Sequence, residues 1–92
     1  MLKVEPIEFE KARHFVITWQ ETNTPAAMVT AIFEGCRDFS PLNLVGLKLA
    51  DGKFYDLTGK FGDVVDLALW LANMVDQVKD ESQLIEFVKG VN

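Results

Sequence analysis

The dipeptide Asp51-Gly52 lies between two apolar-rich segments and constrains the fold more than any other feature of the sequence. Leucines recur over residues 42–49 before it, and residues 53–57 after it contain Phe54, Tyr55 and Leu57. Asp-Gly in such a context is typical of a β-hairpin with a type I′ turn, in which both central residues adopt positive φ. The sequence therefore predicts an antiparallel pair of strands here.

The C-terminal third predicts two helices. The longer one spans residues 63–79, with Asp63 as its N-cap and Asp66 at the third helical position, where the helix dipole favours an acid. A shorter helix is predicted from Ser82, as its cap, to Lys89, because Gly90 is a common helix terminator.

Residues 4–20 fit two patterns. The first consists of two short strands, over residues 4–9 and 15–19, around a turn. The second is a helix with Pro6 in its first turn and with Phe9, Ala12, Val16 and Trp19 on one face. We prefer the strands, because the β-branched and aromatic residues at 15–19 favour β-structure over helix.

The next segment predicts a helix that begins at Thr24 as N-cap and Pro25 as the first helical residue. It ends near Gly35 or Asp38, before Ser40-Pro41. Its apolar face consists of Met28, Val29, Ile32, Phe33 and Cys36.

The predicted order is thus strand, strand, helix, strand, strand, helix, helix. We expect a single α+β domain over residues 1–92, in which an antiparallel sheet of about four short strands packs against two to three helices. A chain of this length forms one core.

Charge and composition limit the function classes. The apolar fraction of 49% disfavours disorder, and the nine basic residues form no cluster that would bind nucleic acid. The net charge of −5 lies mostly in residues 51–92, where eight acids face four bases, and an acidic surface favours a basic protein partner. The longest apolar run, Leu67 to Ala72, is too short to span a membrane, so we expect a cytoplasmic protein without a membrane partner.

Metal, cofactor and catalytic signals are weak. Cys36 and His14 cannot supply the four ligands of a structural zinc site, and the glycines match no phosphate-binding or dinucleotide motif, so we expect no metal and no cofactor. A cysteine-dependent enzyme with Cys36 as nucleophile and His14 as base is retained only as a second alternative. We do not expect an enzyme.

The helix over residues 63–79 offers the most informative surface. Its apolar residues cover an arc of roughly 220°, wider than one packing face requires. Trp70 falls instead on the polar stripe, together with Asp63, Asp66, Asn73 and Gln77. Either the C-terminal helix covers Trp70, or Trp70 anchors a partner, as tryptophans in polar surroundings often do. Tyr55 either extends that contact surface or belongs to the core.

We therefore expect a non-catalytic, acidic protein-interaction module that acts as an inhibitor, antagonist or adaptor. It binds a larger protein with a basic surface, for example a nucleic-acid-binding protein whose basic groove it occupies. Small accessory proteins of phages and mobile elements commonly have this profile. The predicted binding residues are Trp70, Asp66, Asn73, Gln77, Asp63 and Tyr55. The first alternative is a structural homo-oligomer, such as a homodimer, in which the apolar arc of residues 64–78 pairs with its copy.

Overall fold

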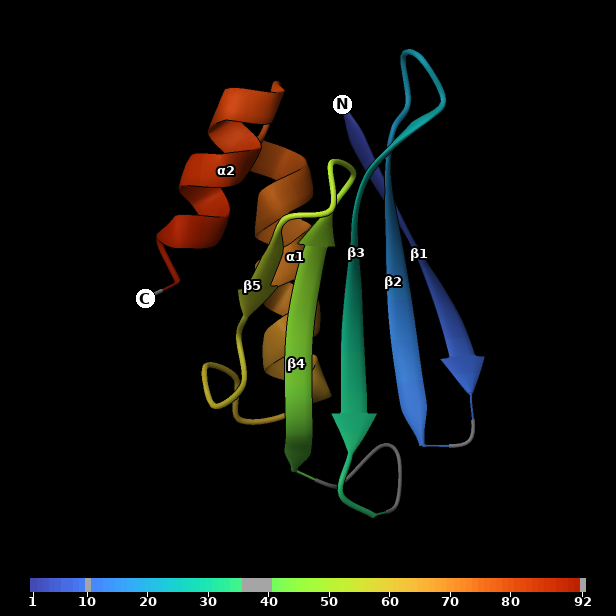
Figure 1. Ribbon diagram of the computed structural model, residues 1–92, viewed down its shortest axis with the longest axis vertical. Coiled ribbons are helices and arrows are strands. Elements are labelled where there is room, and N and C mark those ends of the chain that lie inside the picture. Colours follow the sequence, from blue (N-terminus) through green and yellow to red (C-terminus); the bar gives the residue numbers. More distant parts are fainter. Residues whose placement is uncertain (10, 36–40, 92) are drawn as a thin grey trace.

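The computed structural model describes residues 1–9, 11–35 and 41–91, in which five strands are followed by two helices. The strands are β1 (Leu2–Phe9), β2 (Ala12–Trp19), β3 (Thr24–Phe33), β4 (Leu42–Leu49) and β5 (Phe54–Asp56). They form one antiparallel sheet in chain order, and α1 (Val64–Gln77) lies behind it with α2 (Glu81–Lys89) beside α1 (Figure 1). The predicted α+β class is confirmed, but the sheet has five strands and the helices number two in the described residues.

The strand interpretation of residues 4–20 is confirmed, and both strands are longer than predicted. β1 pairs with β2 from Leu2 opposite Trp19 to Phe9 opposite Ala12. Phe15 and Ile17 of β2 are buried, whereas Val16 between them faces the other side of the sheet, which is the alternation of a strand.

The helix predicted from Thr24 and Pro25 to Gly35 or Asp38 is wrong, because Thr24–Phe33 is the central strand β3. Thr24 is not an N-cap; it pairs with Trp19 across a turn in which Asn23 has a φ of 54°. Alternate residues of β3 are buried, and the residues between them face the other side of the sheet. A central strand with apolar residues on both faces satisfies a helical pattern as well as a strand pattern, so periodicity alone does not separate the two.

The hairpin of β4 and β5 is confirmed, but its turn is not type I′. Gly52 has a φ of 95°, but the φ of Asp51 is not positive, whereas a type I′ turn needs positive φ at both residues. The Gly52 N–H donates to the Leu49 carbonyl at 2.9 Å, and the Leu49 N–H donates to the Lys53 carbonyl at 2.8 Å. This is a three-residue loop, a type I turn followed by a glycine in the left-handed region. The Asp51 side chain stabilises the loop by accepting from the Lys53 N–H at 2.9 Å.

The two helices begin at side-chain caps. Asp63 caps α1 as predicted, because its carboxylate accepts from the Asp66 N–H at 3.0 Å. The Asp66 carboxylate in turn accepts from the Gly62 N–H at 3.1 Å, which satisfies a further backbone donor at this end. The cap of α2 is Asp80 rather than Ser82, and Gly90 ends that helix as predicted.

The core lies between the sheet and the helices. From α1 and α2 it receives Val64, Leu67, Leu71, Met74, Leu84 and Val88, all buried. From the sheet it receives the alternate residues Leu2, Phe15, Ile17, Ala27, Val29, Ala31, Phe33, Val45, Leu47 and Leu49. The helices thus cover only one face of the sheet. The strand residues that alternate with the buried ones point to the opposite face.

Candidate interaction surfaces

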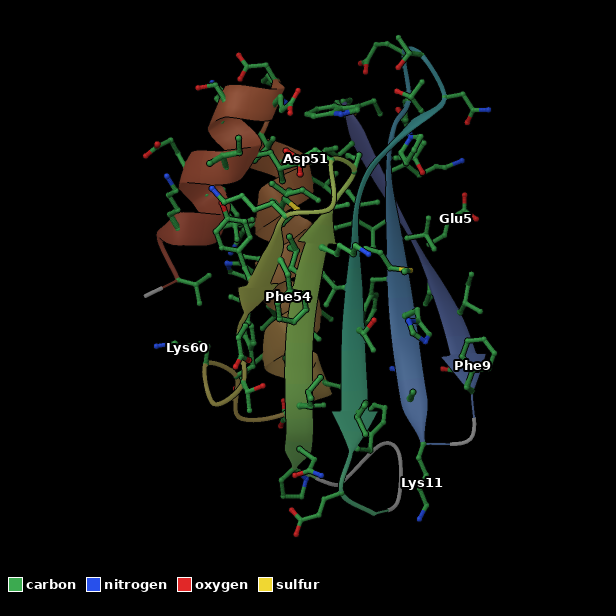
Figure 2. All side chains as sticks on the ribbon, viewed as in Figure 1. Glu5, Phe9, Lys11, Asp51, Phe54 and Lys60 are labelled. Atoms are coloured by element: carbon green, nitrogen blue, oxygen red, sulfur yellow. The ribbon has the colours of Figure 1, made fainter. Side chains whose placement is uncertain are left out.

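The sheet has an open face, which the described helices leave uncovered and toward which Figure 2 is viewed. The alternation of side chains along each strand and the strand register together define the side chains on this face. The apolar and neutral members of the open face are Ile7, Phe9, Ala12, His14, Val16, Met28, Thr30, Ile32, Leu44 and Phe54.

The register arranges these side chains in rows across the strands. One row runs from Ile7 through His14 and Thr30 to Gly46. The row beside it runs from Phe9 through Ala12, Ile32 and Leu44. Opposed side chains in a row lie about 4.5–5.5 Å apart, so each row is a continuous contact surface.

Five large apolar side chains of the open face are strongly solvent-exposed: Ile7 (47%), Phe9 (56%), Met28 (41%), Leu44 (42%) and Phe54 (59%). Met28 and Phe54 belong to a third row, which runs from Glu5 through Val16, Met28 and Lys48 to Phe54. With strands about 4.8 Å apart and about 3.3 Å per residue, the three rows together cover roughly 450 Å², including the charged Glu5 and Lys48. A contiguous apolar patch of a few hundred Å² on a soluble domain is often a binding site. The open face is therefore the largest candidate interaction surface of the described residues.

Phe54 has its exposed position because Gly46 leaves room for it. A Cβ added at Gly46 would lie 2.6 Å from the Cζ of Phe54, so the ring covers the Gly46 backbone. Figure 2 shows Phe54 in front of β4 accordingly. The glycine thus extends the apolar surface from β4 to the short edge strand β5.

A polar pair lies within the open face. The His14 Nδ1 and the Thr30 Oγ1 are 3.0 Å apart on neighbouring strands, and the ring of Phe9 meets the His14 ring edge-on with 5.2 Å between centroids. His14 is therefore a partly buried strand residue with its imidazole held by neighbours. Its proposed catalytic partner Cys36 lies outside the described residues.

Trp70 is partly buried between two other rings. Its centroid lies 5.3 Å from that of Phe61, before α1, and 5.3 Å from that of Phe87, on α2. The C-terminal helix thus contacts Trp70, as one of the two predicted alternatives required. Whether Trp70 also anchors a partner stays a prediction.

The polar residues predicted around Trp70 are exposed on α1. Asp63 and Asp66 are engaged in the helix cap, whereas Asn73 and Gln77 are exposed farther along α1. Tyr55 does not join them on the surface. It pairs with the buried Leu47, which puts its ring on the helix side of the sheet, and its hydroxyl is buried without a hydrogen-bond partner among the described residues.

Two exposed carboxyl groups have perturbed titration. The pKa of Asp56, at the end of β5, is lowered because the hydroxyl and the backbone N–H of Thr58 hydrogen-bond to its carboxylate. The pKa of Glu21 is lowered by a hydrogen bond from the N-terminal ammonium of Met1. Each perturbation follows from a local contact at a turn or chain end, so neither identifies an acid–base centre.

In the part of the chain that the structure describes, no three His, Cys, Asp or Glu side chains lie together as a metal site would require. Neither α1 nor α2 is long and apolar enough to cross a membrane.

Sequence reasoning missed the open face, although a signal for it was present. Met28, Thr30 and Ile32 alternate with Val29, Ala31 and Phe33, which is a strand pattern with apolar residues on both sides.

The chain was also compared with protein-family models, with curated proteins and with solved structures. None of these three comparisons gave a match.

Proposed function

We propose that this chain is a non-catalytic protein-interaction domain that binds another protein through the open face of its sheet. The observation that carries this proposal is the exposure of five large apolar side chains on that one face: Ile7, Phe9, Met28, Leu44 and Phe54. Exposed aromatic and methionine side chains are enriched where proteins bind one another. The binding surface that we propose therefore lies on the sheet, away from Trp70.

The chemistry of the partner follows from the surroundings of the open face. An apolar patch on the partner would cover the rows of Phe9 and Phe54. The protein as a whole carries a net charge of −5, although the charged side chains of the open face itself, Lys3, Glu5, Lys48 and Asp56, are balanced. Basic groups around the partner's apolar patch would therefore speed the encounter and orient it. We place this interaction in the cytoplasm and propose that it inhibits the partner or adapts it to another molecule.

The test is affinity capture from the lysate of the native host, followed by mass spectrometry. The bait that removes the open face carries Met28→Ser and Phe54→Ser, which replace side chains that are 41% and 59% exposed. Both positions are outside the core, so circular dichroism should show an intact fold. We expect this bait to lose the protein that the wild type enriches by at least about tenfold, since buried aromatic anchors contribute most of the energy of an interface.

Two further baits make the result specific. Leu69→Ser is the matched control, because Leu69 is 60% exposed on α1 and lies outside the open face. Trp70→Ala tests the rival surface predicted from the sequence. Capture that is lost with Trp70→Ala in a folded bait, but kept with the double serine bait, would assign binding to the Trp70 stripe and contradict our proposal.

A further inference from the structure

β1 has a free edge, and beside it α1 leaves apolar side chains uncovered. In the described residues β1 pairs only with β2. The exposed side chains of α1 that line this side are Ala68 and Ala72, which we call the α1 flank. They belong to the part of the wide apolar arc that neither the sheet nor α2 uses. The β1 edge and the α1 flank together border a space in which a sixth strand could pair with β1 and pack on α1.

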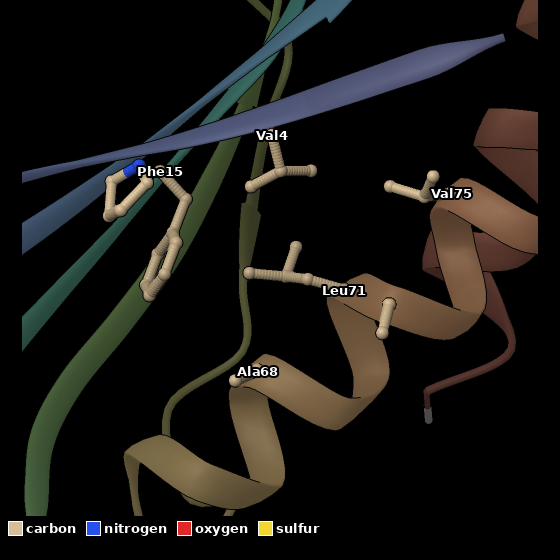
Figure 3. A pocket seen from close by; sticks show the side chains of 7 residues that line it. Val4, Phe15, Ala68, Leu71 and Val75 are labelled. Carbon is tan, nitrogen blue, oxygen red and sulfur yellow. The ribbon is translucent and has the colours of Figure 1, made fainter.

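A groove joins the edge to the flank. It has a volume of about 220 Å³ and is lined by Val4 and Pro6 of β1 and by Phe15, Ala68, Leu71, Ala72 and Val75. Figure 3 shows Val4 above the helix, with Leu71 and Val75 directed toward the strand. Side chains of an added strand that point to the helix side would enter this groove, because every second residue of a strand faces the same side.

The backbone of β1 defines which groups are free at its edge. The Met1 carbonyl accepts from the Gln20 N–H of the neighbouring chain segment at 2.9 Å, so the odd residues of β1 direct their backbone groups toward β2. The even residues Leu2, Val4 and Pro6 direct theirs to the open edge. Pro6 is consistent with this alternation, because proline occurs in edge strands at positions whose backbone nitrogen faces solvent rather than the neighbouring strand.

The side chains of β1 make this edge complementary to itself. Lys3 and Glu5 lie on the open face, exposed, with the Lys3 Nζ 2.8 Å from the Glu5 Oε1. An antiparallel copy with Val4 opposite its own Val4 places Lys3 opposite Glu5 of the second copy, and Glu5 opposite its Lys3. Both cross-strand pairs are then attractive.

Other registers are poorer. Moving the second strand by two residues sets either Lys3 against its own copy or Glu5 against its own copy, which is repulsive. A larger shift centres the pair on Pro6, where neither strand has an N–H, or on Ile7, where Val4 loses its partner. In the favoured register Val4 donates to and accepts from its copy, and the Leu2 N–H donates to the Pro6 carbonyl of the second copy.

We propose that two copies of this chain associate through antiparallel pairing of their β1 edges, with Val4 on the two-fold axis. The sheets of the two copies then continue into one another, and the α1 flanks face each other beneath the new strand pair. Alanines at positions 68 and 72 allow the helices to approach closely there. The inference does not depend on the open-face proposal, since it uses a different surface.

The test exchanges the charges of the Lys3–Glu5 pair and measures mass in solution under reducing conditions. The K3E copy carries acids at positions 3 and 5, and the E5K copy carries bases at both. Alone, each variant opposes like charges twice across the axis. We expect the wild type to have a mass in solution of twice the 10.4 kDa monomer. We expect the dimer dissociation constant of each variant to be about 5- to 100-fold higher than that of the wild type.

Mixing the two variants is the decisive step. In a mixed dimer every acid at positions 3 and 5 faces a base, so K3E and E5K should associate with each other better than either does alone. Loss of the intrachain Lys3–Glu5 contact cannot explain such recovery, because mixing restores it in neither chain. The matched control is K48E, which has the same change of net charge on exposed Lys48 of β4 and should self-associate like the wild type.

Either of two results would overturn the inference. One is a wild-type chain that keeps a mass of 10.4 kDa up to about 1 mM. The other is a dimer that persists equally in K3E and E5K and gains nothing on mixing. In the second case the α1 flank or the open face would hold the copies together.

Discussion

Replacement of Trp70 by alanine tests whether the aromatic contacts between α1 and α2 stabilise the fold. A fully enclosed tryptophan buries roughly 150–250 Å², so a partly buried one removes about 100 Å² from water. At about 25 cal/mol per Å² this burial stabilises the fold by about 2.5 kcal/mol. The ring pairs with Phe61 and Phe87, both at 5.3 Å between centroids, add about 1 kcal/mol.

We therefore expect Trp70→Ala to lower the free energy of unfolding by about 3–4 kcal/mol. A domain of this length has a total stability of about 5–14 kcal/mol, so the variant should fold but melt about 15–25 °C lower. The assay is urea unfolding followed by far-UV circular dichroism at low protein concentration.

The neighbouring residue supplies the control. Leu69 is 60% exposed on the other side of α1, so Leu69→Ala should change the free energy of unfolding by no more than about 0.5 kcal/mol. If Trp70→Ala is as mild as Leu69→Ala, the two ring contacts do not stabilise α2. Trp70 would then be available to a partner, as the sequence analysis predicted for the polar stripe.

Two other substitutions test local features. Asp56→Asn should remove part of the acid sensitivity of the fold. The pKa of Asp56 is lowered in the folded protein, so its ionised carboxylate contributes to stability above the ordinary aspartate pKa. This contribution is lost as the pH falls through the lowered pKa of the folded protein. Unfolding curves of both proteins from neutral pH downward check this, and parallel pH profiles would show that the Thr58 contact contributes nothing. Gly52→Ala should destabilise by about 1 kcal/mol, because Gly52 has a φ of 95°. An unchanged urea midpoint would show that the loop readjusts without strain.

The parts of the fold that were predicted correctly have strong local signals. Asp63 accepts a backbone hydrogen bond at the start of α1 whatever surrounds it, and Gly90 ends α2 for a similarly local reason. The strands of the β4–β5 hairpin were also placed correctly. Its turn type was not, because an Asp-Gly pair fits a three-residue loop as well as a two-residue one, and strand register selects between them.

β3 could not be assigned from local signals, because tertiary context decides it. Thr24-Pro25 resembles a helix start, and Met28, Val29, Ile32 and Phe33 satisfy a helical spacing. The segment nevertheless forms a strand, because β2 and β4 both pair with it and satisfy its backbone groups on both sides. Both pairing partners lie outside the segment, so they leave no mark in its own sequence.

The error at β3 also explains why the open face was missed. With residues 25–38 assigned to a helix, β2 and β4 belong to separate hairpins, and no continuous face exists for Phe9 and Phe54 to share. The apolar residues expected to be in excess of the core then lay on the helix over residues 63–79. Part of that apolar arc is indeed exposed, because Val65 and Leu69 are 58% and 60% exposed on α1.

The open face and the β1 edge do not compete for space. Strand pairing at the edge lies in the plane of the sheet, so the open face of one copy continues into that of the other. The Lys3–Glu5 pairs would then lie at the centre of the joined face, between two apolar regions that begin at Ile7 and Phe9 of each copy. A partner with a single apolar patch would bind twice to such a dimer, and a partner with two patches would gain affinity from their linkage without any new contact. Self-association would thus change the strength of partner binding without occupying the surface that performs it.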